Sequence, residues 1–77
     1  MKHHDKIDLL KIFGNAVAKK RRQLEMSQEK LAEITGLHRT YIGMLERGER
    51  NPTLVTIARF SKGLKLEAHE LLKLSNF

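Results

Sequence analysis

The chain has 77 residues, enough for one small domain, and carries 15 Lys and Arg against 9 Asp and Glu, a net charge of +6. It contains no cysteine, which excludes disulfides and thiolate metal sites. No apolar run exceeds three residues, which excludes a transmembrane helix of about 20 residues, and the N-terminus MKHHDKIDLL lacks the apolar region of a signal peptide. We therefore expect a soluble, cytoplasmic protein with no membrane contact, and the basic charge favours nucleic acid as partner.

The spacing of apolar residues predicts helices, because they recur at intervals of three and four and never alternate cleanly with polar residues. One such stripe runs from Ile7 and predicts a first helix that ends near Leu24 or Glu25. Residues 1–6 before it are expected to form a flexible tail. Gly14 inside the stripe costs about 1 kcal/mol relative to Ala, which indicates either close helix packing or a later helix start.

Caps and turn residues mark four further helices. Ser27 is a favourable N-cap, and Gly36 and Gly48 suit the left-handed residue that follows a last helical turn. Pro52 cannot continue a helix, so a new one begins after it, with Thr53 as its N-cap. The helices expected after the first cover residues 28–35, 39–47, 54–62 and 68–74.

The five predicted helices, joined by short turns, indicate one all-α domain over residues 7–77, a compact five-helix bundle. Its expected core consists of Leu31, Ala32, Leu37, Ile42, Leu45, Leu54, Ile57, Ala58, Phe60 and Leu64. The second and third helices are joined by Gly36-Leu37-His38 alone, which is too short for an antiparallel hairpin. Such a pair is a helix-turn-helix, here over about residues 28–47, whose second helix can enter a DNA major groove.

Three stretches resemble the phage-repressor-type (Xre/Cro-like, lambda-repressor-like) helix-turn-helix family: residues 27–32 (SQEKLA), 36–42 (GLHRTYI) and 45–54 (LERGERNPTL). The resemblance covers about residues 13–72. It implies a five-helix domain that binds double-stranded operator DNA as a dimer and regulates transcription. Small stand-alone members include the controller proteins of restriction–modification systems, and antitoxin-type autoregulators and phage regulators share the same domain.

The residues expected to contact DNA bases lie at the starts of the second and third helices. Arg39 can offer two donors to guanine, and the helix dipole disfavours a cation in a first turn, which argues for a functional role. The resemblance places Gln28 on a phosphate or a base edge, and His38 is either a base contact or only a cap or phosphate contact. The expected base contacts are Gln28, His38, Arg39, Thr40 and Met44. Gly43 and Met44 stand where the family often has polar side chains, so hydrogen-bonded readout is not expected from them.

The resemblance also implies residues that hold the DNA backbone and the recognition helix. The expected phosphate contacts are Lys20, Arg22, Ser27, Tyr41, Arg47, Arg50 and Asn51. The alternatives are a solvated face for Lys20 and Arg22, a charged loop for Arg47, Arg50 and Asn51, and packing against the second helix for Tyr41. Arg21 and Glu46 match a family ion pair that locks the third helix against the first.

A homodimer is expected because a single helix-turn-helix reads few base pairs, whereas a two-fold dimer reads a palindrome with half-sites about 34–36 Å apart. The C-terminal third carries surplus apolar residues, and the expected interface is Val55, Leu66, Ala68, Leu74 and Phe77. Scattered surface hydrophobes are the alternative. Lys65 and Glu67 depart from the Gly and the Ser or Thr that the family often has before the last helix.

The sequence thus predicts a sequence-specific DNA-binding transcriptional regulator, a homodimer without cofactor. The alternatives are an antitoxin-like module whose main partner is an unknown protein, and a non-specific binder of DNA or RNA. No catalytic motif is present, so we expect no enzyme activity. His3 and His4 adjoin Asp5 but have no metal-site spacing, so no metal is expected.

Overall fold

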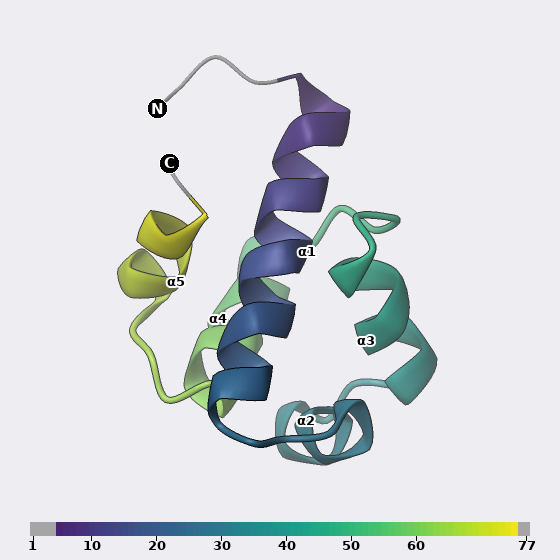
Figure 1. Cartoon of the computed structure of the whole chain (residues 1–77), viewed down its shortest axis with the longest axis vertical. Helices are drawn as coiled ribbons and strands as arrows, with labels where there is room; N and C mark the ends of the chain where they lie inside the picture. The colour runs from purple at the N-terminus through teal and green to yellow at the C-terminus, as the bar shows by residue number, and fades with distance from the viewer. Residues whose placement is uncertain (1–4, 76–77) are drawn as a thin grey trace.

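The computed structural model describes residues 5–75, apart from the side chain of Ile7. Within that range five helices follow in the order α1 (Lys6–Gln23), α2 (Gln28–Thr35), α3 (Arg39–Glu46), α4 (Leu54–Gly63) and α5 (Ala68–Leu74). The long α1 lies between α3 on one side and α5 on the other, with α4 behind it and α2 below its C-terminal end (Figure 1). The predicted all-α, five-helix bundle is confirmed for this part of the chain.

Helix α1 begins and ends slightly earlier than the apolar stripe predicts. The carboxylate of Asp5 accepts a hydrogen bond from the backbone N–H of Asp8 at 2.8 Å, and this cap starts the helix at Lys6. The expected tail over residues 1–6 therefore does not include Asp5 and Lys6, and residues 1–4 lie outside the described residues. The helix ends at Gln23 because the chain turns through a left-handed residue, Glu25, with φ of 55°.

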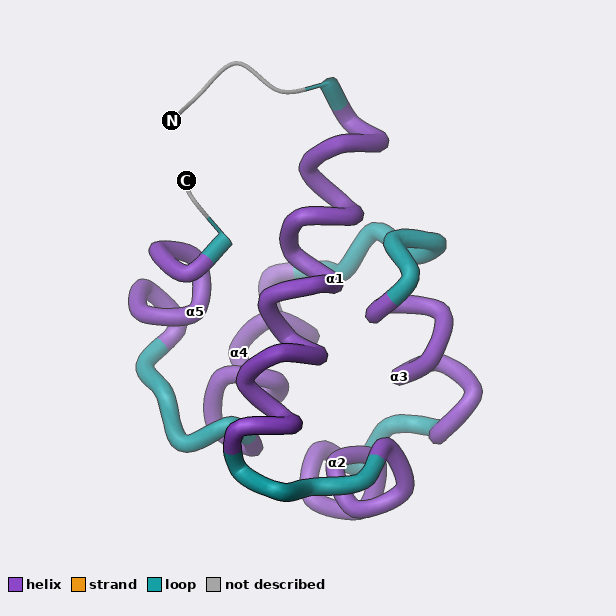
Figure 2. The backbone as a smooth tube through the Cα atoms, in the orientation of Figure 1, coloured by secondary structure: helices purple, strands orange, loops and turns teal. Residues whose placement is uncertain are grey.

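The caps predicted for the middle helices are present. The hydroxyl of Ser27 accepts from the N–H of Lys30 at 2.9 Å, and Gly36 follows α2 with φ of 73°. Thr53 caps α4 by accepting from Thr56 at 3.1 Å. Compared with the predicted spans, α3 ends one residue earlier and α4 one residue later. The connections between these helices are short (Figure 2).

The turn before α5 accommodates the two residues that depart from the family pattern, Lys65 and Glu67. Lys65 stands in the left-handed region, with φ of 61°, where a Gly is otherwise common. The carboxylate of Glu70 accepts from the N–H of Glu67 at 2.8 Å, so the acid one turn later caps the start of α5. Neither change shifts the helix, because α5 covers the predicted residues.

The core lies where α1 meets the other helices. Its fully or almost fully buried members are Phe13, Val17, Leu31, Ala32, Ile42, Leu45, Phe60, Leu64 and Leu71. Two residues expected in it are exposed: Leu54, at 78%, and Ala58. The buried residues of α4 are Phe60, Ser61 and Gly63, with Ile57 partly buried, and Leu54 and Ala58 lie beside that face rather than on it.

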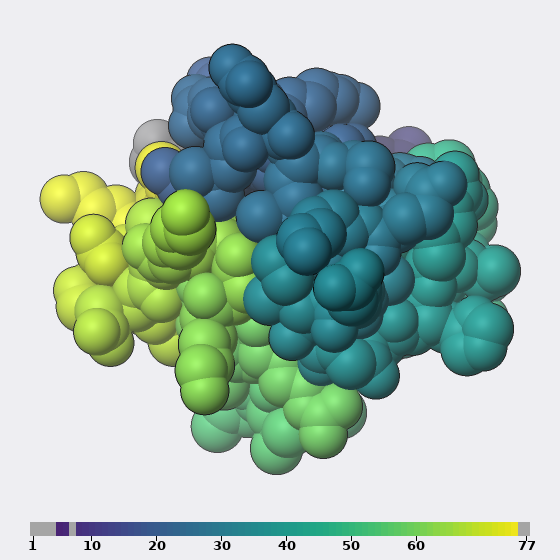
Figure 3. All heavy atoms as spheres, turned by 90° about the horizontal axis from the view of Figure 1, so that it is seen from below, coloured from purple at the N-terminus to yellow at the C-terminus, as the bar shows by residue number. Residues whose placement is uncertain are grey.

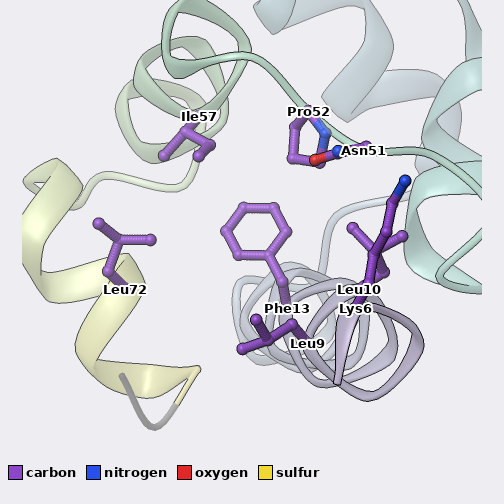
Figure 4. A pocket seen from close by; sticks show the side chains of 8 residues that line it. All are labelled: Lys6, Leu9, Leu10, Phe13, Asn51, Pro52, Ile57 and Leu72. Atoms are coloured by element: carbon purple, nitrogen blue, oxygen red, sulfur yellow. The ribbon is translucent and has the colours of Figure 1, made fainter. Parts of the chain in front are cut away.

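No helix between residues 5 and 75 combines the length and the apolar character needed to cross a membrane. An apolar pocket of about 420 Å³ opens among α1, α4, α5 and the loop after α3 (Figure 4). Phe13 projects into it, with Ile57 and Leu72 around the ring and Asn51 and Pro52 at its edge.

Candidate nucleic-acid interface

Gly14 sets how closely α3, the helix expected to read DNA, approaches α1. A Cβ atom built on Gly14 would collide with the carbonyl oxygen of Leu45 and lie 2.7 Å from that of Glu46. The absence of a side chain therefore lets the two backbones meet. Of the two interpretations of Gly14 offered by the sequence, close packing is correct, because α1 is continuous through this residue.

Arg21 and Glu46 form the expected ion pair between α1 and α3. The guanidinium donates to the carboxylate twice, Nε to Oε2 at 2.7 Å and Nη2 to Oε1 at 3.0 Å, and Nη1 donates to the carbonyl of Met26 at 2.8 Å. The two side chains are 10% and 5% exposed. The hydrogen bond to Glu46 raises the pKa of Arg21 further above its usual range, so the guanidinium stays charged throughout the physiological pH range.

Gln28 belongs to the same network, which the sequence did not predict. Its side-chain nitrogen donates to Oε1 of Glu46 at 2.8 Å. One carboxylate on α3 thereby holds the end of α1 and the start of α2 together. The side-chain nitrogen of Gln28 is thus engaged within the protein, and its oxygen lies 3.8 Å from where a Cβ of residue 43 would stand.

The first residues of α3 are exposed, as base contacts require. His38 occupies the N-cap position, but its side chain makes no capping hydrogen bond. Arg39 is half-exposed, and its Nε lies 4.0 Å from a carboxylate oxygen of Glu29. Thr40 is exposed as well. These three side chains therefore project from the protein at the N-terminal end of a helix fixed by the Glu46 network.

Further along α3 the side chains are more enclosed. Tyr41 is half-buried and packs against the core, which favours the packing interpretation of its ring. Met44 is also half-buried, so little of it is available to a base. Gly43 is covered by its neighbours: a Cβ there would lie 3.2 Å from Nη1 of Arg47 and 3.7 Å from Nη1 of Arg39.

The loop after α3 carries paired charges that the sequence did not predict. Arg47 donates twice to Glu49, Nε to Oε2 at 2.8 Å and Nη2 to Oε1 at 3.3 Å. This hydrogen bonding lowers the pKa of Glu49, so its carboxylate is ionised at neutral pH. Arg50 donates to the carbonyl of Glu49 at 3.4 Å. No spacing rule pairs residues two apart outside a strand, so the sequence carried no signal for this contact.

The expected phosphate contacts do not all lie together. Lys20 lines a surface hollow with Lys73 and Leu74, on the α5 side of α1. Arg22 is exposed in the last turn of α1, and Asn51 borders the apolar pocket (Figure 4). Seen from the end of the bundle, α5 and the α3 region lie on opposite sides, separated by α2 and the end of α1 (Figure 3).

Comparison with known proteins assigns the fold to a family. The helix-turn-helix profile matches residues 17–71. The chain belongs to the helix-turn-helix family. Control protein C.SmaI from Serratia marcescens is 47% identical over 66 residues, which make up 86% of this chain and 79% of that protein. The match confirms the resemblance to controller proteins.

Solved structures agree with this assignment. The restriction–modification controller protein C.AhdI from Aeromonas hydrophila is 44% identical, with a TM-score of 0.77 over 83% of this chain and 96% of that one. C.Esp1396I, solved as a nucleoprotein complex, has a TM-score of 0.81 at 32% identity and covers 88% of both chains. This helix-turn-helix protein is therefore a DNA-binding transcriptional regulator and not an enzyme.

Proposed function

We propose that this protein binds a palindromic operator as a homodimer, with α3 in the major groove, and controls transcription of a restriction–modification system. The observation that carries the proposal is the exposed start of α3, Arg39 and Thr40, on a helix locked by the buried Arg21–Glu46 pair. A recognition helix needs both features, because base readout requires reachable side chains in a fixed orientation. The similarity to C.SmaI and C.AhdI supports the controller role.

The residues at the protein surface divide into base-reading and backbone-holding roles. Arg39 can donate to O6 and N7 of one guanine, and Thr40 can offer its hydroxyl or methyl group to the adjoining base. His38, exposed at the N-cap, is proposed as a further contact, whereas the half-buried Met44 offers a base little surface. The proposed phosphate contacts are Arg22, Ser27, Tyr41, Arg47 and Arg50, whereas Lys20 and Asn51 contribute less because they lie on other faces of the bundle.

The dimer interface is proposed to centre on the start of α4. Leu54 is 78% exposed and Val55 64%, and the exposed Ala58 follows one turn later, so the three form an apolar stripe beside the buried face of α4. Of the interface expected from sequence, Val55 fits this stripe and Leu74 is also exposed. Leu66 and Ala68 are half-buried within their own chain, and Phe77 lies outside the described residues.

Such a dimer would respond to the concentration of the protein, because a monomer–dimer equilibrium makes operator occupancy steep in total protein. We expect it to act in the cytoplasm, where its DNA partner is found.

The test is a binding selection from genomic fragments with purified protein at physiological salt. We expect enrichment of a palindrome whose half-site centres lie about one DNA turn apart. Arg39→Ala should then weaken binding by about 1–3 kcal/mol and relax selection at one base pair per half-site. Arg59→Ala, which removes an exposed cation from α4, is the matched control and should leave the selected base pair unchanged.

Uniform retention of fragments, without a preferred sequence, would refute the operator proposal. The exposed stripe on α4 would then favour the other candidate, a module whose main partner is a second protein.

A further inference from the structure

The outer face of α3 brings together two cations that the sequence had given separate roles. Arg39, Gly43 and Arg47 follow one another at intervals of four residues and so lie on one face of the helix axis. Because Gly43 has no side chain, Nη1 of Arg47 and Nη1 of Arg39 both reach over its bare backbone. Arg47 is thus folded back along the recognition helix instead of extending from the loop.

Three donors around Gly43 lie near glutamate carboxylates. Gln28 donates to the buried Glu46 at 2.8 Å, and Arg39 approaches Glu29 at 4.0 Å. Arg47 and Glu49 form the tightest of the exposed pairs, with two hydrogen bonds at 2.8 and 3.3 Å. Their side chains are 59% and 49% exposed, so a DNA phosphate can reach the guanidinium and exchange with the carboxylate.

We propose that Glu49 is a specificity-determining residue of the DNA-binding surface, which keeps Arg47 on an intramolecular carboxylate until an operator phosphate in the correct register replaces it. This inference rests on the proposed function. In a non-specific complex the protein has no fixed register, so Arg47 stays on Glu49 and adds no phosphate contact. At the operator the base contacts of α3 fix the register, and the exchange takes place.

The salt dependence of binding measures this exchange directly. Each phosphate that a cation neutralises steepens the plot of log affinity against log salt by about 0.9. Glu49→Gln releases Arg47 and removes a negative charge from the DNA-facing side. We therefore expect the variant to bind non-specific duplex roughly two- to fivefold more tightly, with a slope steeper by about 0.9. At the operator the slope should not change, so the ratio of specific to non-specific affinity falls.

Two comparisons isolate the pair from the change in net charge. Glu33→Gln removes the same charge from α2, where Glu33 pairs with Lys30 at 3.3 Å and is 74% exposed. This control should leave both slopes unchanged. In an Arg47→Ala background, Glu49→Gln should no longer alter the non-specific slope, because the cation that it releases is missing. Circular dichroism checks that each variant is folded, which is expected because all the substituted side chains are exposed.

The experiment uses fluorescence anisotropy with the selected operator and with a scrambled duplex of the same length. If the wild-type protein discriminates between them but Glu49→Gln behaves like Glu33→Gln, the role of Glu49 is refuted while the proposed function stands. If Glu49→Gln steepens the non-specific slope equally in the Arg47→Ala background, the effect comes from the change in net charge, and the proposal is also refuted. If the wild-type protein does not discriminate at all, the proposed function fails and the specificity role of Glu49 fails with it.

Discussion

Removing the carboxylate of Glu46 should cost this small domain a large part of its stability. That carboxylate accepts three hydrogen bonds, two from Arg21 and one from Gln28, and its side chain is 5% exposed. In Glu46→Ala the guanidinium of Arg21 keeps only the carbonyl of Met26, at 2.8 Å, as a partner among these contacts. Breaking one side of a buried ion pair costs about 3–5 kcal/mol, and we expect the lower end because that carbonyl remains.

A loss of about 3 kcal/mol is large against the roughly 4–12 kcal/mol expected for a domain of this length. Since about 1 kcal/mol shifts the melting temperature of such a domain by about 4–8 °C, the midpoint should fall by about 12–24 °C. Thermal unfolding followed by circular dichroism measures this. Glu33→Ala, which removes an exposed acid paired with Lys30, is the control and should change stability by no more than about 0.5 kcal/mol.

The double variant Arg21→Met with Glu46→Leu separates the unpaired charge from the lost contact. Replacing both members of a buried pair by apolar residues is often close to neutral, so this variant should be more stable than Glu46→Ala alone. Equal melting temperatures for Glu46→Ala and Glu33→Ala would refute the reasoning, as would a double variant less stable than the single one.

Two backbone positions give further predictions. Gly14→Ala should destabilise the protein by at least about 1–3 kcal/mol, because the new Cβ meets backbone carbonyls of α3 that cannot move aside; urea unfolding that matches wild type would contradict the close contact. Lys65→Gly should raise the free energy of unfolding by up to about 1 kcal/mol, seen as a higher urea midpoint, because φ of 61° strains a residue with a Cβ. A lower midpoint would show that the entropy of glycine in the unfolded chain outweighs that strain.

The fold could be predicted from the sequence because its signals are local and agree with one another. Apolar spacing, the caps Ser27 and Thr53 and the left-handed Gly36 all mark helix ends. The end of α1 was predicted too late because Glu25 adopts the left-handed conformation, for which a glutamate gives no sequence signal. Leu54 was placed in the core because its spacing fits the apolar pattern, but it lies beside the buried face of α4 and is 78% exposed.

The candidate site was predictable in its position but not in its contacts. The resemblance to a family indicated the Arg21–Glu46 pair, which is buried and therefore constrained by the packing of α1 against α3. The pairs Arg47–Glu49 and Arg39–Glu29 are exposed, and pairs of this kind differ from their alternatives by less than about 1 kcal/mol. From the sequence, Gly43 was treated as a position that loses a contact to DNA. In the structure its lack of a side chain leaves room for Arg47 to lie along the helix.

The dimer can be tested at the exposed stripe of α4. If Val55 is buried between two copies, Val55→Glu places an unpaired carboxylate in an apolar interface, which costs several kcal/mol and should give a monomer by analytical ultracentrifugation. Its melting temperature should also lose the concentration dependence that a dimer confers. Ile34→Glu, at a 47% exposed apolar residue of α2, is the control and should remain dimeric. A Val55→Glu protein that stays dimeric while Leu74→Glu dissociates would move the interface to α5, because each variant places its charge on a different helix.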